Sequence, residues 1–272
     1  MGGLSFYPCP FENRWVIYMP MFFIDEKFQV QGTTIISGED ARHIIKVLRY
    51  KPGDVLRISD GVHAEGSAII EGIDHRNLII KVRGLEKNNI VDIKPKITLL
   101  QGLPKGDKMD FILQKNTEIG VSEFLPVYTE RTIVELCDDR MRRRGHRWGK
   151  ILREAAKQCG RPDIPKVNPP VRFDRALENI CDYDLAIIPW EREKAMDLRQ
   201  LIKSADENVS KAAVFIGPEG GFCEEEIEKA VKAGFLPVSL GPRIMRTETA
   251  GVVINSVLMY ELGDLGGSVC QR

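Results

Sequence analysis

From Lys96 onward the chain alternates short apolar runs with amphipathic segments, and this alternation limits the possible folds more than any other feature. Helices are predicted over 106–120, 146–160, 224–233 and about 247–262. The apolar runs predict strands, and they read ITLLQGL, FLPVYTE, DLAIIPWE, AAVFIGPEG and LPVSLGPR. Nearly continuous apolar strands joined by helices indicate a parallel sheet that is covered on both faces. We therefore predict an α/β fold for this part of the chain.

The segment before Lys96 has a different pattern, with short β-rich runs between turn residues. The runs read FFID, TTII, VLRISD, HAEGSAII and NLIIKVRG. One helix is predicted over 39–50, with Ala41, Ile44, Ile45 and Leu48 on its apolar face. Several short strands in so short a segment predict a small β-barrel. The polar segment 86–95 is predicted to be a linker.

These patterns divide the chain into three parts. Residues 1–20 are predicted to be an extension outside the fold, because Pro8, Pro10, Glu12 and Arg14 interrupt their apolar character and no basic start precedes them. Residues 21–90 are the predicted barrel, and residues 91–272 are the predicted α/β domain.

The composition excludes several kinds of protein. No apolar run approaches the ~20 residues that a membrane-spanning helix needs. The six cysteines are scattered without a C-x-x-C pair, so neither a zinc site nor a disulfide framework is expected, and reduced thiols fit a cytoplasmic protein. Lys+Arg and Asp+Glu both number 39, so the net charge does not indicate a nucleic-acid partner.

Three predicted strands end in unusual sequences: IIPWEREK (187–194), FIGPEGG (215–221) and LGPRIMRTETA (240–250). Ligands of open parallel sheets bind beyond the carboxyl ends of the strands. One glycine-rich loop alone is typical of a tight strand–helix turn. Two such loops, together with the charges of Arg243, Arg246 and Glu248 at a junction where burial is costly, favour a ligand pocket. The patterns of a P-loop, of a dinucleotide fingerprint and of a G-x-S-x-G hydrolase are absent.

Local basic segments are compatible with a phosphate backbone as ligand. The segment 140–166 is rich in arginine and lysine, with Arg147 and Arg161 on polar helix faces, Trp148 in the apolar stripe, and arginines 140 and 142–144 in a predicted preceding loop. Further basic residues are Lys105, Lys108 and Lys115 around the helix at 106–120, and His43, Lys46 and Arg49 in the barrel. A solvated helix face with a basic loop explains the segment 140–166 equally well, and each of the other basic groups is a weak signal alone.

Taken together, the motifs resemble the RsmE family of 16S ribosomal RNA uridine-N3 methyltransferases, within the SPOUT superfamily. The matching pieces are HIIKVLR (43–49), QKNTEIGV (114–121), RWGKILREAAKQCGR (147–161), IGPEGGF (216–222) and LGPRIMRTETA (240–250). They occur in family order over about residues 21–262. Departures are mild: Met245 and Ile44 stand where leucine is more usual, and Cys223 replaces a serine or threonine.

The resemblance implies a PUA-like N-terminal barrel, a C-terminal parallel sheet with a deep trefoil knot, a homodimer and S-adenosylmethionine as methyl donor. The 16S ribosomal RNA of the small subunit would be the substrate. The cofactor would lie among residues of the three strand ends. These are Ile188, Pro189, Trp190, Gly217, Pro218, Glu219, Gly220, Gly221, Leu240, Gly241, Ile244, Met245 and Thr247.

Arg246 is the candidate for stabilising negative charge on the uracil oxygens during methyl transfer. Glu248 either orients Arg246 or accepts the N3 proton, and orientation is favoured because an ion-paired carboxylate is a weak base. Thr247 is a candidate cap of the last helix. The candidates for RNA binding are His43, Arg49, Lys105, Lys115, Arg147 and Arg161.

Two other functions stay open. One is a related knotted methyltransferase that acts on tRNA or on a ribose 2′-OH, and the other is an RNA-binding protein without enzymatic activity. The second is the weaker alternative, because an RNA-binding protein needs neither GPEGG nor RIMRTETA.

Overall fold

The computed structural model describes residues 6–8, 15–17, 20–24, 32–62, 64–75, 77–87, 94–133, 138–206 and 208–267. The chain forms two compact units. Unit 1 comprises Met1–Val91 together with Ala156–Ile164, and unit 2 comprises Asp92–Ala155 and Pro165–Arg272. Within the predicted extension 1–20, strands β1 (Phe6–Pro8) and β2 (Trp15–Ile17) pair antiparallel with each other, and most of its other residues lie outside the described ones.

Unit 1 is built on a five-stranded sheet in the order β3-β5-β6-β7-β4. Its strands are β3 (Met21–Phe23), β4 (Gly32–Ile36), β5 (Val55–Ser59), β6 (Ala64–Asp74) and β7 (Asn77–Lys87). Alternate residues of these strands point into one core, which includes Leu56, Ile58, Leu78 and Ile80. The strands predicted in this segment are therefore confirmed. Of the predicted linker 86–95, residues 88–93 lie outside the described residues.

The predicted helix 39–50 consists of two pieces, α1 (Gly38–Arg42) and the π-helix η1 (His43–Leu48). Ala41 and Ile44 are fully buried in the core of unit 1, and Ile45 and Leu48 pack against it, so the predicted apolar face is confirmed. The π-helical winding was not anticipated. It ends at Arg49, which adopts the left-handed conformation with φ 56°.

Unit 2 contains a parallel sheet in the order β10-β9-β8-β13-β12-β14, with β11 also paired to β9. The long strands are β8 (Lys96–Gly102), β9 (Glu123–Tyr128), β12 (Leu185–Pro189) and β13 (Lys211–Ile216). The short ones are β10 (Lys166–Val167), β11 (Val171–Arg172) and β14 (Leu236–Val238). The predicted parallel sheet is confirmed.

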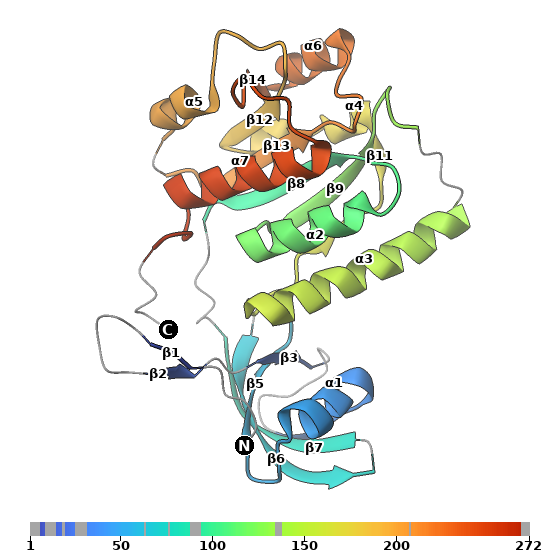
Figure 1. Ribbon diagram of the computed structural model, residues 1–272, viewed down its shortest axis with the longest axis vertical. Helices are drawn as coiled ribbons and strands as arrows, with labels where there is room; N and C mark the ends of the chain where they lie inside the picture. Colours follow the sequence, from blue (N-terminus) through green and yellow to red (C-terminus); the bar gives the residue numbers. More distant parts are fainter. Residues whose placement is uncertain are drawn as a thin grey trace. The chain divides into compact units, whose positions relative to one another are not determined.

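Helices cover both faces of this sheet (Figure 1). On one face α2 (Lys108–Ile119) and α7 (Thr247–Glu261) pack on each other, and Gly251 of α7 approaches Leu99 and Ile216. On the other face Phe215 belongs to a core with Phe173 and Ile227, which come from α4 (Phe173–Ala176) and α6 (Glu224–Ala233). The remaining short helices are η2 (Ile180–Asp182) and α5 (Leu198–Ser204).

Helix α3 (Asp138–Cys159) begins eight residues earlier than predicted. Arginines 140 and 142–144 therefore lie in the helix, and their placement in a preceding loop was wrong. Arginine is a good helix former, and the helix continues through Gly145. Trp148 is 2% exposed, as predicted for a core residue. The last residues of α3 belong to unit 1, where Lys157 pairs with Asp40 at 2.5 Å.

The sheet order of unit 2 brings together the strand ends that the sequence singled out. Strand β12 lies between β13 and β14, and Pro189 at its end is opposite Val238 at the end of β14. Beyond the strands, Asp197 forms a bridge with Ser239. The loops that follow β12, β13 and β14 therefore leave the sheet at the same edge.

Among the described residues, every helix is too short or too polar to cross a membrane.

Candidate active site

A cavity of about 1000 Å³ lies at this edge of the sheet in unit 2. Most of its lining comes from the three segments 189–197, 216–222 and 239–247, which follow β12, β13 and β14. Lys108, Gln200 and Ala250 complete the wall. The prediction that the three strand ends enclose one pocket is confirmed.

The glycine loop, residues 217–221, owes its shape to a tight turn. The N–H of Gly221 donates to the carbonyl of Pro218 at 2.9 Å, and Gly221 has φ +67°, which disfavours any residue with a side chain. A Cβ on Gly217 would approach the backbone of Gly221 to 3.2 Å. The loop thus presents main chain, without side chains at these positions, to the cavity.

The other two segments are joined to each other by backbone hydrogen bonds. Trp190 N–H donates to the carbonyl of Val238 at 3.0 Å, and Ser239 N–H donates to the carbonyl of Met196 at 2.9 Å. Leu198 N–H in turn donates to Ser239 O at 3.1 Å. These bonds make the walls formed by 189–197 and 239–241 one continuous backbone structure.

The start of α7 is attached to the glycine loop through Thr247. Its hydroxyl donates to the carbonyl of Gly217 at 2.6 Å and accepts from Nε2 of Gln101 at 2.9 Å. The predicted capping role of Thr247 was wrong, because Arg246 is the N-cap residue and the Thr247 hydroxyl is occupied by these two bonds. Gln101 is fully buried, and its Oε1 has no hydrogen-bond partner among the described residues.

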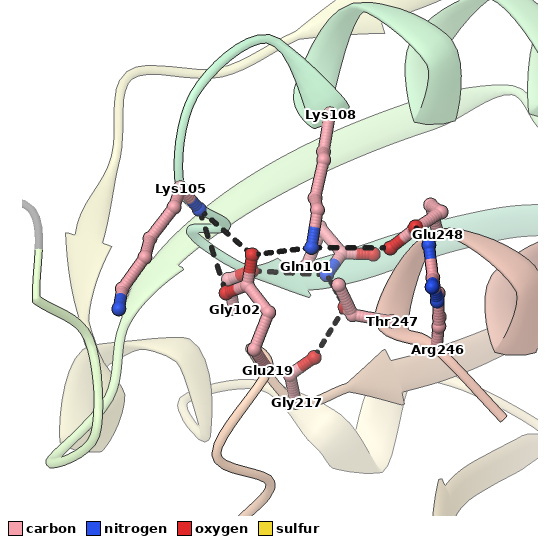
Figure 2. A network of polar contacts seen from close by, with 9 residues as sticks. All are labelled: Gln101, Gly102, Lys105, Lys108, Gly217, Glu219, Arg246, Thr247 and Glu248. Carbon is pink, nitrogen blue, oxygen red and sulfur yellow. Dashed lines mark hydrogen bonds and ion pairs between the residues drawn. The ribbon is translucent and has the colours of Figure 1, made fainter. Parts of the chain in front are cut away.

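Four charged side chains of alternating sign follow one another beside the cavity (Figure 2). Lys108 Nζ lies 2.8 Å from Glu219 Oε1 and 3.7 Å from Glu248 Oε2. Glu248 Oε1 lies 4.0 Å from a guanidinium nitrogen of Arg246. The side chain of Arg246 is 84% exposed, whereas that of Glu248 is 16% exposed. The series thus runs from the glycine loop through α2 to an exposed guanidinium.

The pKa shifts in this series follow from its hydrogen bonds. The hydrogen bond to Glu219 raises the pKa of Lys108, and the nearby charges of Glu219 and Glu248 add to it. Burial raises the pKa of Glu219, but the hydrogen bonds from Lys108 and from backbone N–H groups outweigh burial and hold this pKa below its usual range. Both groups are therefore charged at neutral pH.

Most of the predicted cofactor residues line the cavity. The lining includes Pro189, Trp190, Gly217, Pro218, Glu219, Gly220, Gly221, Leu240, Gly241, Ile244, Met245 and Thr247, and also Arg246. Ile188 is fully buried in the core with Phe215 and does not line the cavity. Glu248 is not among the residues that line the cavity, but its ion-pair partners Lys108 and Arg246 are.

Sequence reasoning did not assign Gln101, Lys108 or Arg131 to this site, yet all three make hydrogen bonds that hold it together. Gln101 and Lys108 belong to the network of Figure 2. Arg131 donates to the carbonyl of Gly220 at 2.5 Å and so connects the glycine loop to the segment that follows β9. Lys108 offered one signal, because a lysine in the first turn of a helix opposes the helix dipole and needs a compensating anion.

The candidate RNA-binding residues differ in their accessibility. In unit 1, His43 and Arg49 are exposed, but Arg161 is only 8% exposed and its guanidinium pairs with Asp163 at 2.7 Å. In unit 2, Lys105 is exposed, Lys115 is half-buried and pairs with Glu118 at 2.9 Å, and exposed Arg147 pairs with Asp110. The structure thus leaves Arg161 poorly placed to reach a phosphate.

Comparison with protein-family models identifies both parts of the chain. Residues 92–259 match the model of an RNA methyltransferase domain, and residues 36–83 match the model of an RNA methyltransferase PUA domain. These matches agree with the α/β unit and with the PUA-like domain expected from the resemblance.

Curated relatives cover nearly the whole chain. The ribosomal RNA small subunit methyltransferase E of Bacillus subtilis is 31% identical, over 92% of this chain and 99% of its own length. The protein of the same name from Buchnera aphidicola is 34% identical, over 90% of this chain and 95% of its own length.

Solved structures agree with this relationship. The ribosomal RNA small subunit methyltransferase E of Neisseria gonorrhoeae, crystallised bound to S-adenosyl methionine, matches with a TM-score of 0.79 at 31% identity, over 91% of this chain and 99% of that one. A protein of Legionella pneumophila in complex with the bound cofactor SAM matches with a TM-score of 0.80 at 32% identity, over 92% of this chain and the whole of that one. The chain with this cavity and this polar network therefore belongs to the ribosomal RNA small subunit methyltransferase E family of RNA methyltransferases.

Proposed function

We propose that the protein transfers a methyl group from S-adenosylmethionine to N3 of a uridine in the 16S ribosomal RNA of the small subunit. The observation that carries this proposal is the cavity in which two glycine-bearing strand ends meet beside the exposed guanidinium of Arg246. Family membership supports the substrate class, because the curated relatives are named for the RNA of the small ribosomal subunit.

The residues present fit the cofactor. The glycine loop and the 239–245 segment offer backbone N–H and C=O groups that can read an adenine edge, and a side chain at Gly221 would strain the loop that presents them. Of the residues predicted to contact the cofactor, we propose all those that line the cavity. Ile188 is excluded because it is fully buried in the core and does not line the cavity. When bound, the cofactor supplies an electrophilic methyl group on its sulfonium.

Arg246 is the proposed catalytic residue. As the N3 proton of uridine passes to solvent water, negative charge spreads onto O2 and O4, and a guanidinium that is already in place stabilises this charge. Glu248 is proposed to orient Arg246. Its two carboxylate oxygens face two different cations, Arg246 and Lys108, and a carboxylate engaged in this way is a weak base.

The substrate uridine must be unpaired or flipped out of a helix, because N3 is engaged when uridine is base-paired. We assign the surrounding phosphates to the exposed basic residues His43 and Arg49 of unit 1 and to Lys105 and Arg147 of unit 2. Lys115 belongs to this group if its bond to Glu118 opens, and the burial of Arg161 argues against a direct contact.

The remaining family features are also part of the proposal. Residues 21–90 act as a PUA-like RNA-binding barrel and residues 91–272 as a knotted methyltransferase domain. The protein works as a homodimer in the cytoplasm, together with the small ribosomal subunit, and the apolar helix α7 packs across the dimer. Half-buried Val253 and Val257 and exposed Tyr260 of α7 support such a packing surface.

One assay tests the proposal. The protein is incubated with methyl-labelled S-adenosylmethionine and small ribosomal subunits that lack the modification, and the RNA is digested to nucleosides. We expect the label in 3-methyluridine of 16S ribosomal RNA. Label in a 2′-O-methyl nucleoside or in tRNA would favour the related knotted methyltransferase. If calorimetry showed no binding of S-adenosylmethionine at millimolar concentration, an RNA-binding protein without enzymatic activity would be favoured.

A further inference from the structure

Lys108 stands where a positive charge is unfavourable. It is the first residue of α2, and the N-terminus of a helix carries partial positive charge. Two carboxylates from distant parts of the chain compensate it, Glu219 of the glycine loop and Glu248 of the first turn of α7. The Lys108 ammonium therefore connects three segments of the chain, which a lysine in contact with solvent alone would not do.

The first carboxylate fixes the ammonium firmly. Glu219 accepts from Lys108 Nζ at 2.8 Å and also from the backbone N–H of Lys105, at 3.1 Å to one oxygen and 3.4 Å to the other. The glycine loop and the start of α2 are therefore joined by more than one bond, as Figure 2 shows. Because the bonds from the Lys105 N–H do not involve the side chain of Lys108, they keep part of this connection when Lys108 is replaced.

The second carboxylate depends more strongly on Lys108. The side chain of Glu248 is 16% exposed, and its Oε2 has no hydrogen-bond partner among the described residues. Its charge is balanced by Lys108 at 3.7 Å on one oxygen and by Arg246 at 4.0 Å on the other. A largely buried carboxylate that loses one of two cations draws the other one toward itself.

We propose that Lys108 is a positioning residue for methyl transfer. Its ammonium neutralises part of the charge of Glu248, and the guanidinium of Arg246 therefore stays directed toward the cavity. This inference rests on the proposed function, in which Arg246 meets the uracil oxygens. Without Lys108, Arg246 becomes the main cation for Glu248 and turns away from the reacting base. The cofactor walls persist, because the bonds of Thr247 and Gly221 that hold them do not involve Lys108.

The test compares Lys108→Met, Lys108→Arg and Lys229→Met in the full-length protein. Lys229 is the matched control, because it also forms an ion pair, with Asp174 at 2.7 Å, and a hydrogen bond to that carboxylate likewise raises its pKa. We expect Lys108→Met to lower kcat by about 10- to 100-fold, as small misplacements of a reacting group do. The Kd of S-adenosylmethionine should change by less than about 3-fold, Lys108→Arg should recover most of kcat, and Lys229→Met should match the wild type.

A double-mutant cycle separates positioning from general support of the fold. In a Glu248→Gln background the carboxylate charge is gone, so Lys108→Met should lower kcat by less than about 3-fold further. Equal losses in both backgrounds would overturn the inference, and so would an unchanged kcat or a loss confined to cofactor Kd. If Lys108→Met does not fold, Lys108→Gln takes its place in the same cycle.

Transfer is measured as total label in ribosomal RNA, whichever nucleotide receives it. Label at a position other than uridine N3 would therefore refute the proposed substrate atom while the Lys108 effect could still be seen. A wild-type protein that transfers no methyl group at all would overturn both the proposed function and this inference.

Discussion

The central residue of the proposed site is Arg246, whose main chain is fixed by α7 while its side chain is exposed. Its carbonyl accepts from the N–H groups of Thr249 and Ala250, both at 2.9 Å, because it caps the start of α7. Its side chain is 84% exposed beside the cavity. An arginine at this junction is thus held by the helix, and its guanidinium contributes little to the packing of the fold.

Replacing Arg246 by alanine should therefore strongly slow methyl transfer without unfolding the protein. We expect kcat to fall by about 100- to 1000-fold, as on loss of one charge-stabilising donor. The Kd of S-adenosylmethionine and the melting temperature should stay close to wild type. Arg175→Ala, at an exposed arginine of α4, serves as the control. A kcat of Arg246→Ala close to the wild-type value would refute the assignment.

The pair of Glu219 and Lys108 predicts a pH dependence of stability. Because the folded pKa of Glu219 lies below its unfolded value of about 4.3, its stabilising effect is present above that pH and is lost as the pH falls through the folded pKa. Glu219→Gln should lower the free energy of unfolding by roughly 1 kcal/mol near pH 7, a modest value for a partly exposed pair. The difference should shrink below about pH 4.

Urea titrations of both proteins at several pH values measure this difference. Glu228→Gln, at an exposed glutamate of α6, should show almost no difference at any pH. A Glu219→Gln effect that stays constant from neutral to acid pH would show that the carboxylate charge is not what stabilises the loop.

At this scale the sequence predicts some roles and misses others for a physical reason. Arg246 and Glu248 stand out because charges at a strand–helix junction are unusual. Lys108 and Gln101 contact Glu219 and Thr247, which are 111 and 146 positions away along the chain. A local pattern contains no information on such contacts, and only the packing of α2 and α7 on the sheet creates them.

At the scale of elements, the junction between β8 and the glycine loop leaves no room for a side chain. A Cβ on Gly102, the last residue of β8, would lie 2.5 Å from Cδ and 2.6 Å from N of Pro218. The close approach of these two segments fixes how far the glycine loop extends into the cavity.

Gly102→Ala should therefore displace the loop, with a loss of about 1–3 kcal/mol in stability and a weaker affinity for S-adenosylmethionine. Gly149→Ala is the matched control, because a Cβ added to Gly149 within α3 would meet nothing within 4 Å, and it should stabilise the protein by about 0.5–1 kcal/mol. Thermal unfolding and calorimetric titration measure both effects. An unchanged affinity of Gly102→Ala for S-adenosylmethionine would contradict the proposal that this junction contributes to cofactor binding.

Elements with a strong pattern were predicted well. Apolar runs gave the four long parallel strands, and helix α6 was predicted with its observed bounds, Glu224–Ala233. Strands β10 and β11 have two residues each, too few for any periodicity. The start of α3 was missed because a glycine among arginines resembles a break, and the π-helix η1 was missed because its apolar residues fit an α-helical face equally well.

At the scale of the whole molecule, the chain returns to its first unit after entering the second. Residues 156–164 belong to unit 1, where the hydroxyl of Ser59 donates to the carbonyl of Pro162 at 2.5 Å. Between the two units the sequence predicted a single boundary, near residue 90. It missed the return of residues 156–164 because nine residues within a longer helix and turn show no change of composition. The motif RWGKILREAAKQCGR thus contributes to both units.

Assembly gives a prediction at this scale. If α7 packs across a homodimer, a charge at exposed Tyr260 should prevent association, so Tyr260→Glu should sediment as a monomer and the wild type as a dimer. Val231→Glu, at an exposed apolar residue of α6, should remain dimeric. A dimeric Tyr260→Glu protein, or a monomeric wild type, would exclude this interface.

The claim on which the function depends is that one cavity holds the methyl donor beside Arg246. A crystal structure of the protein with S-adenosylmethionine tests it directly. We expect the cofactor to contact the backbone of 217–221 and 239–245, with its methyl group facing the guanidinium of Arg246. A cofactor bound elsewhere, or one whose methyl group points away from Arg246, would contradict the proposed mechanism.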